Sequence, residues 1–202
     1  MTEKEKMLRG ELYDPNDPEL IALREKSHRL SKEYNDTLET EPEKRQALLD
    51  ARNMKRGPEV CVLSPMQFDY GCFTTIGENT FINFNFTCVD CCPVDIGANV
   101  FMGPNISILT PVHPLRWQER NLYRRADGVL TDREYAKPVT IEDNCWISGN
   151  VTICGGVTIG AGSVIGAGSV VTRDIPPDTF AVGVPCRPVR PITEADSMMK
   201  TE

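Results

Sequence analysis

The sequence of 202 residues contains no run of about 18 apolar residues, so we expect no transmembrane helix. The N-terminus, MTEKEKMLRG, is charged where a signal peptide needs an apolar stretch, which favours a cytoplasmic location. Basic residues are in the minority, 22 against 29 acidic ones, and the net charge is -7. Nucleic acids and anionic membranes bind basic surfaces, so we expect neither as the main partner. This balance still allows a small anionic cofactor, which needs only a few local cations.

Histidine is scarce, with only His28 and His113 in the chain. A catalytic zinc site on a solenoid would need three histidine ligands around an open position, which this chain lacks. Cys88, Cys91 and Cys92 form a C-x2-C-C cluster, but no second pair at a zinc-binding spacing occurs. We therefore predict no metal site and interpret these cysteines as reduced packing residues. The chain also lacks the nucleophile elbow, the P-loop and the dinucleotide fingerprint in a strand–helix context.

A six-residue repeat is the dominant feature of the chain from about residue 76. Three such units close one triangular coil of 18 residues, and stacked coils pair their backbones. Side chains alternate along a strand, so each leading residue and the small or β-branched residue four positions later point to the same side. A β-sandwich with short strands is the alternative, but a sandwich rarely keeps this phase over 141–176. The leading residues are Ile76, Ile82, Cys88, Val94, Ile96, Met102, Ile108, Ile141, Ile147, Ile153, Ile159, Ile165 and Val171.

The first 57 residues have the period of helices instead. Asp17-Pro18 supplies a cap and a first-turn proline for one helix. Thr40-Glu41-Pro42-Glu43 has the spacing of a capping box, and Gly57-Pro58 is expected to end that second helix. We predict a helical module, 1–57, that covers the open end of a solenoid over 58–190. The apolar stripe of the first helix consists of Leu20, Leu23, Ser27, Leu30, Tyr34 and Leu38.

Two segments depart from the repeat. A charged and aromatic excursion interrupts it over 114–140, and long excursions from compact domains are usually functional or mobile. The tail, 191–202, is polar. His113 stands between two prolines where the excursion begins, so it is a candidate proton acceptor near neutral pH, although a structural role is the alternative. His28 is expected to be an ordinary solvent-facing helix residue.

An ordered set of motifs resembles the hexapeptide-repeat sugar O-acetyltransferases, specifically the maltose and galactoside acetyltransferase family. The set covers nearly the whole chain, and its order makes it far more specific than single hexapeptides. The motifs are Gly10-Glu11-Leu12-Tyr13, Asp17-Pro18-Glu19-Leu20, Phe68-Asp69-Tyr70-Gly71, Asn83-Phe84-Asn85, Thr110-Pro111-Val112-His113-Pro114-Leu115, Asp143-Asn144-Cys145-Trp146-Ile147, Val171-Thr172-Arg173-Asp174-Ile175-Pro176 and Gly183-Val184-Pro185-Cys186-Arg187.

The resemblance implies a mainly β fold, a left-handed parallel β-helix with an N-terminal α-helical cap. It also implies acetyl-CoA as acetyl donor and a homotrimer with active sites between subunits. The handedness comes from the resemblance alone, since ordinary parallel crossovers are right-handed. The trimer has a physical argument as well: a triangular solenoid has flat faces, so a pocket is most easily built between neighbouring prisms.

The resemblance also assigns roles to individual residues. His113 matches the general base and Asn83 the donor that stabilises the oxyanion and contacts the cofactor. Asp69 matches an acceptor contact, and Asp17 matches another more loosely. Arg173, Arg187 and Arg190 could equally be a solvated basic rim. The full set of cofactor-side matches is Asn83, Trp146, Gly149, Ala167, Thr172, Arg173, Arg187 and Arg190.

The chain departs from the galactoside enzymes at three places, which concern the acceptor more than the donor. An acidic acceptor position falls on Cys91, next to Asp90, and a cofactor-contact serine falls on Gly149. The excursion is longer than usual. We therefore expect a sugar O-acetyltransferase acting on a maltose, glucose or galactoside type of acceptor. The alternatives are an acetyltransferase for a non-sugar hydroxyl compound such as an antibiotic, and a non-catalytic assembly protein.

Overall fold

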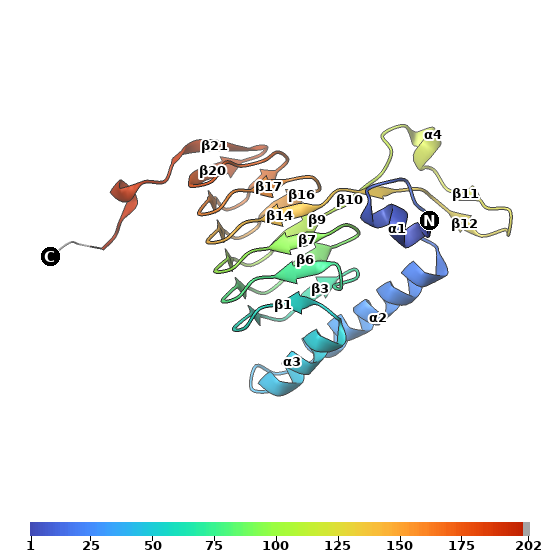
Figure 1. Cartoon of the computed structure of the whole chain (residues 1–202), viewed down its shortest axis with the longest axis horizontal. Helices are drawn as coiled ribbons and strands as arrows, with labels where there is room; N and C mark the ends of the chain where they lie inside the picture. The colour runs from blue at the N-terminus through green and yellow to red at the C-terminus, as the bar shows by residue number, and fades with distance from the viewer. Residues whose placement is uncertain (200–202) are drawn as a thin grey trace.

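The computed structural model describes residues 1–199 and shows a three-sided prism of stacked coils (Figure 1). The predicted parallel β-helix is confirmed, since every strand pair on the three faces is parallel except the last. The first face holds β1 (Lys55–Arg56), β4 (Thr74–Ile76), β7 (Val94–Ile96), β14 (Val139–Ile141) and β17 (Thr158–Ile159). The second face holds β2 (Cys61–Val62), β5 (Phe81–Ile82), β8 (Phe101–Met102), β15 (Trp146–Ile147), β18 (Val164–Ile165), β20 (Thr179–Gly183) and β21 (Cys186–Pro191). The third face holds β3 (Met66–Phe68), β6 (Phe86–Val89), β9 (Ser107–Leu109), β16 (Thr152–Cys154) and β19 (Val170–Val171).

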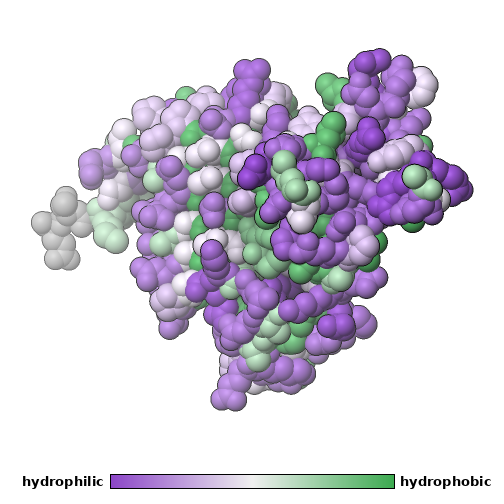
Figure 2. Space-filling model, turned by 45° about the vertical axis from the view of Figure 1, so that its right-hand side comes forward, coloured by the Kyte–Doolittle hydropathy of each residue, from purple (hydrophilic) through white to green (hydrophobic). Residues whose placement is uncertain are grey.

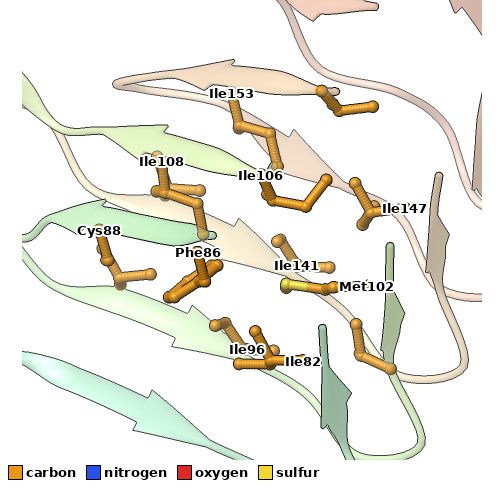
Figure 3. Close-up of a cluster of buried hydrophobic side chains, with 14 of the residues drawn as sticks. Ile82, Phe86, Cys88, Ile96, Met102, Ile106, Ile108, Ile141, Ile147 and Ile153 are labelled. Carbon is orange, nitrogen blue, oxygen red and sulfur yellow. The ribbon is translucent and has the colours of Figure 1, made fainter. Parts of the chain in front are cut away.

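The predicted leading residues form columns inside the prism. On the first face Ile76 pairs with Ile96, which pairs with Ile141, and Ile159 continues the row. Each of these side chains is buried, and Figure 3 shows residues of several rows converging in the interior. Most residues four positions after the leaders are buried with them, among them Val100, Ile106 and Val151, as the strand period predicts. The backbone pairing therefore fixes which side chains fill the core.

The corners bring successive coils into very close contact. Gly77 shows why a small residue is needed there: a Cβ on it would lie 2.4 Å from the backbone nitrogen of Ala98. Asparagine supplies the other corner feature, because it tolerates the left-handed backbone conformation. Asn85 and Asn105 both have φ 61° and are joined by a side-chain hydrogen bond of 2.9 Å. The six-residue period alone does not predict this asparagine ladder.

The helical module comprises α1 (Glu3–Leu8), α2 (Pro18–Asn35) and α3 (Pro42–Ala51). Asp17 caps α2 as predicted, and its side chain accepts a hydrogen bond from the Glu19 amide. The capping box at Thr40–Glu43 is wrong: Glu41 is the N-cap residue and its side chain binds the amide of Leu38. The helix also ends before Gly57, because Lys55–Arg56 already pairs with β4. The predicted stripe stops short at Leu38, which is exposed beyond the end of α2.

Side chains of the module satisfy the unpaired backbone groups of the first coil, since a terminal coil has no neighbour on one side. Asn35 accepts a hydrogen bond from the Met66 amide and donates one to the Met66 carbonyl. The Tyr34 hydroxyl and the Arg45 guanidinium donate to the Val62 carbonyl. Apolar residues of α2 and α3, Tyr34 and Leu49, also join the main core cluster.

The excursion follows β10 (Pro111–Val112) and contains α4 (Trp117–Arg120), β11 (Tyr123–Arg124), β12 (Leu130–Thr131) and β13 (Tyr135–Ala136). It folds back against the helical module, where Asp14 pairs with Arg125 at 2.6 Å and accepts a hydrogen bond from Thr131. Figure 2 shows it at the upper right as a mainly hydrophilic protrusion. The repeat resumes at Val139. The described part of the predicted 191–202 tail includes a short 3-10 helix, Glu194–Asp196, and residues 200–202 lie outside the described range.

None of the helices between residues 1 and 199 has the length and apolar composition of a membrane-spanning segment. All eight cysteines lie in the described range, and none of them forms a disulfide. Within the same range, no group of three or more histidine, cysteine or acidic side chains could hold a metal ion.

The corner packing leads to a prediction about stability. Gly77→Ala should lower the free energy of unfolding by about 1–3 kcal/mol, because the new methyl group overlaps backbone atoms that cannot move cheaply. Gly149→Ala is the matched control, since a Cβ there would meet its nearest neighbour, Pro104, at 3.4 Å. Chemical denaturation of the two variants at one protein concentration measures the difference. Equal losses of stability would contradict the packing argument.

Candidate active site

At the edge between the third and first faces, the chain has more residues than the six-residue repeat requires. The leaders Cys88 and Ile96, on either side of this edge, are eight positions apart rather than six, and Ile108 and Ile141 are 33 apart. We call this the His113 edge, because His113 follows β10 where the excursion leaves it. Asp69, which follows β3, lies along the same edge. A regular prism is therefore irregular at one edge, and the candidate base and one predicted acceptor contact lie there.

His113 lies between two carboxylates that the excursion brings back to it. Its Nδ1 atom is 3.5 Å from Oδ2 of Asp132, and its Nε2 atom is 3.7 Å from Oε2 of Glu134. The side chain is 46% exposed, so the ring is accessible while both nitrogens face acceptors. A carboxylate beside one ring nitrogen fixes the tautomer, which is what a general base needs.

Glu134 is the more firmly held of the two carboxylates. Its Oε1 atom accepts a hydrogen bond from the buried Tyr13 hydroxyl, and its backbone forms a β-bridge with Tyr13. Burial raises the pKa of the Glu134 carboxyl above its ordinary value, while Tyr13 and His113 oppose that effect. Tyr13 of the helical module thus contacts Glu134, the carboxylate that faces the candidate base His113.

Asp132 and Glu134 were not predicted from the sequence. They reach His113 because β10 and β13 pair antiparallel, with Val112 opposite Tyr135. The next position on each strand places Glu134 opposite His113. The only available signal was a pair of acidic residues just before the repeat resumes, and their register could not be read from composition.

A second edge, between the second and third faces, holds three of the predicted cofactor residues. Asn83 follows β5, Gly149 follows β15 and Ala167 follows β18, so they lie at the same edge in three coils, with the β8 coil between those of Asn83 and Gly149. Backbone hydrogen bonds connect these corners, for example from the Gly168 amide to the Gly149 carbonyl at 3.0 Å. The Asn83 side-chain oxygen accepts a hydrogen bond from the Phe84 amide at 2.8 Å, so its NH2 group is the part left to act as a donor. We call this the Asn83 edge.

The two edges lie on opposite sides of the third face. From Asn105 at one corner to Thr110 at the other, the chain advances by five residues, or roughly 16 Å along a strand. Along the prism axis, Asn83 and His113 differ by about one coil, close to 5 Å. One prism therefore holds the two residues at similar heights without bringing them together.

The two predicted acceptor contacts have different environments. Asp69 lies on the His113 edge, and its Oδ1 atom is 3.3 Å from Nε2 of His28 on α2. His28 is half-exposed as predicted, but it is paired rather than simply solvated. One side-chain oxygen of Asp17 accepts the capping hydrogen bond of α2, and Asp17 also lines a hollow of about 540 Å³ beside Tyr13.

The remaining predicted cofactor residues lie toward the C-terminal end of the prism. Trp146 is about half-exposed on the outer side of the second face, in register with Phe101 and Val164. Thr172, Arg173 and Arg187 are exposed. Arg190 is already engaged, because both of its terminal nitrogens bind the Asp196 carboxylate, at 2.9 and 2.6 Å. The structure thus brings cations and an aromatic surface to one end but leaves them on more than one face.

A buried carboxylate lies beneath the His113 edge. Asp90 accepts hydrogen bonds from the Tyr70 amide at 2.8 Å and the Thr74 hydroxyl at 2.9 Å. These bonds tie the 69–74 corner, which carries Asp69, to the coil above it. Burial raises the pKa of Asp90 to about 6 despite these donors.

Comparison with known proteins gives two family-model matches. Residues 6–51 match the maltose acetyltransferase hexapeptide capping motif, and residues 138–173 match the bacterial transferase hexapeptide with six repeats. The galactoside O-acetyltransferase of Escherichia coli (strain K12) is 38% identical over 192 residues, which cover 95% of this chain and 90% of that protein.

Two solved structures are similar to this chain over nearly its whole length. A maltose O-acetyltransferase from Clostridium difficile 630 superposes with a TM-score of 0.86 at 45% identity, covering 96% of this chain and 99% of that one. A hexapeptide-repeat containing acetyltransferase from Vibrio cholerae O1 biovar eltor, complexed with acetyl coenzyme A, gives a TM-score of 0.81 at 40% identity. That superposition covers 96% of this chain and 100% of the other.

The buried carboxylate makes stability depend on pH. Because the pKa of Asp90 is about 6 in the folded protein against 3.8 ordinarily, its contribution to stability is fully present below about pH 4. The contribution is lost as pH rises through about 6, and it amounts to about 3 kcal/mol. Asp90→Asn cannot ionise, so the stability of the wild type relative to this variant should fall as pH rises from about 4 to about 6 and level off above that.

Urea denaturation at fixed protein concentration across that range is the measurement. Asp95→Asn, at an exposed position on β7, is the control and should show no such fall. If the difference in the free energy of unfolding between wild type and Asp90→Asn does not change with pH, folding does not raise the pKa of Asp90.

Proposed function

The chain belongs to the maltose and galactoside O-acetyltransferase family of hexapeptide-repeat proteins, and we propose that it transfers an acetyl group from acetyl-CoA to a hydroxyl of a sugar such as maltose, glucose or a galactoside. The observation that carries this proposal is His113, an accessible imidazole with a carboxylate beside each ring nitrogen. A base of this kind suits proton removal from an alcohol near neutral pH. The cytoplasmic location expected from the sequence stays a prediction.

His113 acts as the general base. It removes the proton from the attacking sugar hydroxyl while that oxygen forms a bond to the thioester carbonyl carbon. Glu134, which Tyr13 fixes, faces Nε2, and Asp132 faces Nδ1, so one carboxylate holds the ring while the other nitrogen takes the proton. When the carbon–sulfur bond breaks, His113 returns the proton to the departing CoA thiolate. The products are the acetylated sugar and CoA, and no covalent enzyme intermediate is needed.

Asn83 stabilises the negative charge that develops on the carbonyl oxygen. Its side-chain oxygen is held by the Phe84 amide, so the NH2 group is the donor that remains for the oxyanion. Because Asn83 and His113 lie on different edges of one prism, the complete site needs two copies of the chain. We propose a homotrimer in which the Asn83 edge of one copy faces the His113 edge of its neighbour at nearly the same height.

The residues along the Asn83 edge fit an extended thioester cofactor. Gly149 and Ala167 leave the backbone open there, and Trp146 offers a flat apolar surface on the adjoining face. Arg173, Arg187 and Thr172 can meet phosphate groups at the C-terminal end. Arg190 can join them only by exchanging its Asp196 carboxylate for a phosphate.

A sugar acceptor is favoured by the carboxylates that surround the base. Asp69 on the same edge can accept hydrogen bonds from sugar hydroxyls, and Asp17 lines the hollow beside Tyr13. A non-sugar hydroxyl compound, such as an antibiotic, would meet the same base and the same donor. An acceptor panel therefore decides between them.

The expected result of that panel is thiol release from acetyl-CoA that depends on a sugar. Glucose, maltose, isopropyl galactoside and chloramphenicol would be compared by coupling the released CoA to a thiol reagent. Turnover with chloramphenicol alone would replace the sugar by a non-sugar acceptor. A protein that neither binds acetyl-CoA by calorimetry nor releases thiol would instead be a non-catalytic assembly protein.

His113→Ala should reduce turnover by about two to four orders of magnitude, the usual effect of removing a general base. The melting temperature should change little, because the ring is half-exposed. Asn83→Ala should also lose most activity. If each site combines the two edges of different copies, unfolding and refolding a 1:1 mixture of the two variants should restore about a quarter of the wild-type sites.

A mixture of His113→Ala with the double variant His113→Ala/Asn83→Ala is the matched control and should stay inactive, because it contains no base. Recovery absent from the first mixture, with trimers present by light scattering, would place Asn83 and His113 in the same copy. Turnover close to wild type in His113→Ala would remove this residue from the mechanism.

A further inference from the structure

His28 lies where the helical module meets the His113 edge. It occupies the middle of α2, and its Nε2 atom faces Oδ1 of Asp69 at 3.3 Å. The side chain of His28 is 47% exposed and that of Asp69 is 26% exposed, so both polar groups are accessible from outside. One turn earlier on α2, a terminal nitrogen of Arg24 donates to the Pro15 carbonyl and the Tyr70 hydroxyl, each at 3.0 Å.

A line of contacts joins this pair to the candidate base. Oδ2 of Asp69 is 3.8 Å from the Cys91 thiol, and Cys91 lies in one buried cluster with Tyr13. Tyr13 in turn binds Glu134, which faces His113. The His28–Asp69 pair and His113 therefore lie at the two ends of one stretch of the surface.

The wall between the two ends offers little to a polar ligand. Cys91 is 3% exposed, and burial raises the pKa of its thiol, so it remains neutral. Tyr13 is 1% exposed and has its hydroxyl committed to Glu134. Asp69 and His28 are exposed polar groups at the far end of this stretch, so they can meet a hydroxyl remote from the attacked one.

We propose that His28 is a specificity-determining residue which, together with Asp69, binds two neighbouring hydroxyls of a neutral sugar ring at the end of the acceptor site remote from His113. This inference rests on the proposed function, because it presumes that an acceptor is bound against His113.

The chemistry of the pair suits a diol. The carboxylate of Asp69 accepts a hydrogen bond from one hydroxyl, while the imidazole of His28 can donate to or accept from the next one. The Nε2 atom faces Asp69, so Nδ1 is the ring atom left to face a ligand. Supplying this group from α2 makes the helical module part of the acceptor site as well as a cover for the first coil.

Steady-state kinetics of His28→Leu test the inference, with glucose, maltose or isopropyl galactoside, whichever turns over fastest in the wild type. The KM for the sugar should rise about tenfold, the effect of losing one or two hydrogen bonds. The kcat should stay within about threefold, and the KM for acetyl-CoA should not change. His28→Gln retains a donor and an acceptor, so it should recover most of the loss.

Lys32→Gln is the matched control, one turn along the same helix, where Lys32 pairs only with the exposed Asp36. It should leave both KM values at the wild-type level. Asp69→Asn should raise the sugar KM as well, and its combination with His28→Leu should cost less than the product of the two single effects, because they act as one unit.

The possible failures can be told apart. A sugar KM unchanged in His28→Leu, in a wild-type background that transfers acetyl groups to that sugar, overturns this inference and leaves the proposed function standing. A loss of kcat and melting temperature without a change in KM would make His28 a structural residue and overturn it too. A wild type that acetylates no sugar overturns the proposed function and this inference with it.

Discussion

The in-register pairing of each coil with the next is the constraint on which the rest of the structure depends. It lines up equivalent positions of successive coils along the prism. A residue type that is required at one position of the coil therefore recurs as a column of similar residues. Isoleucine at the leading position makes a continuous core, as in the Ile76, Ile96, Ile141 row. Glycine or asparagine at the corners makes straight, closely packed edges. A residue placed just after a strand, such as Asn83, is therefore located at a known edge and height.

The same regularity limits what one prism can do, because flat faces and tight corners leave no room for a pocket. The chain adds chemistry by departing from the repeat at a single edge. Extra residues there release the excursion, whose return strand brings Glu134 to His113. The helical module then meets this edge twice, through Tyr13 on Glu134 and through His28 on Asp69. Two additions far apart in the sequence thus meet at the one irregular edge.

The solenoid could be predicted from the sequence because its period is local and its core residues repeat. That the Ile147 side chain points into the core, for example, follows from its place in the six-residue period. The capping box at Thr40 could not be trusted in the same way, since Glu41 satisfies the amide of Leu38 instead. His113 was found by its position at the break in the repeat. Asp132 and Glu134 were not, because they depend on how β13 pairs with β10 after 22 intervening residues. His28 was expected to be solvated, since its partner Asp69 lies 41 positions away.

The two ends of the stack close in different ways. A column of parallel coils has no intrinsic length, so an uncovered end would template the addition of another molecule. At the N-terminal end, Asn35 takes both backbone groups of Met66 that a further coil would use. At the other end, β21 runs antiparallel and contains Pro188 and Pro191, which have no amide hydrogen to offer. These features keep the molecule discrete where its own architecture would otherwise polymerise into a filament.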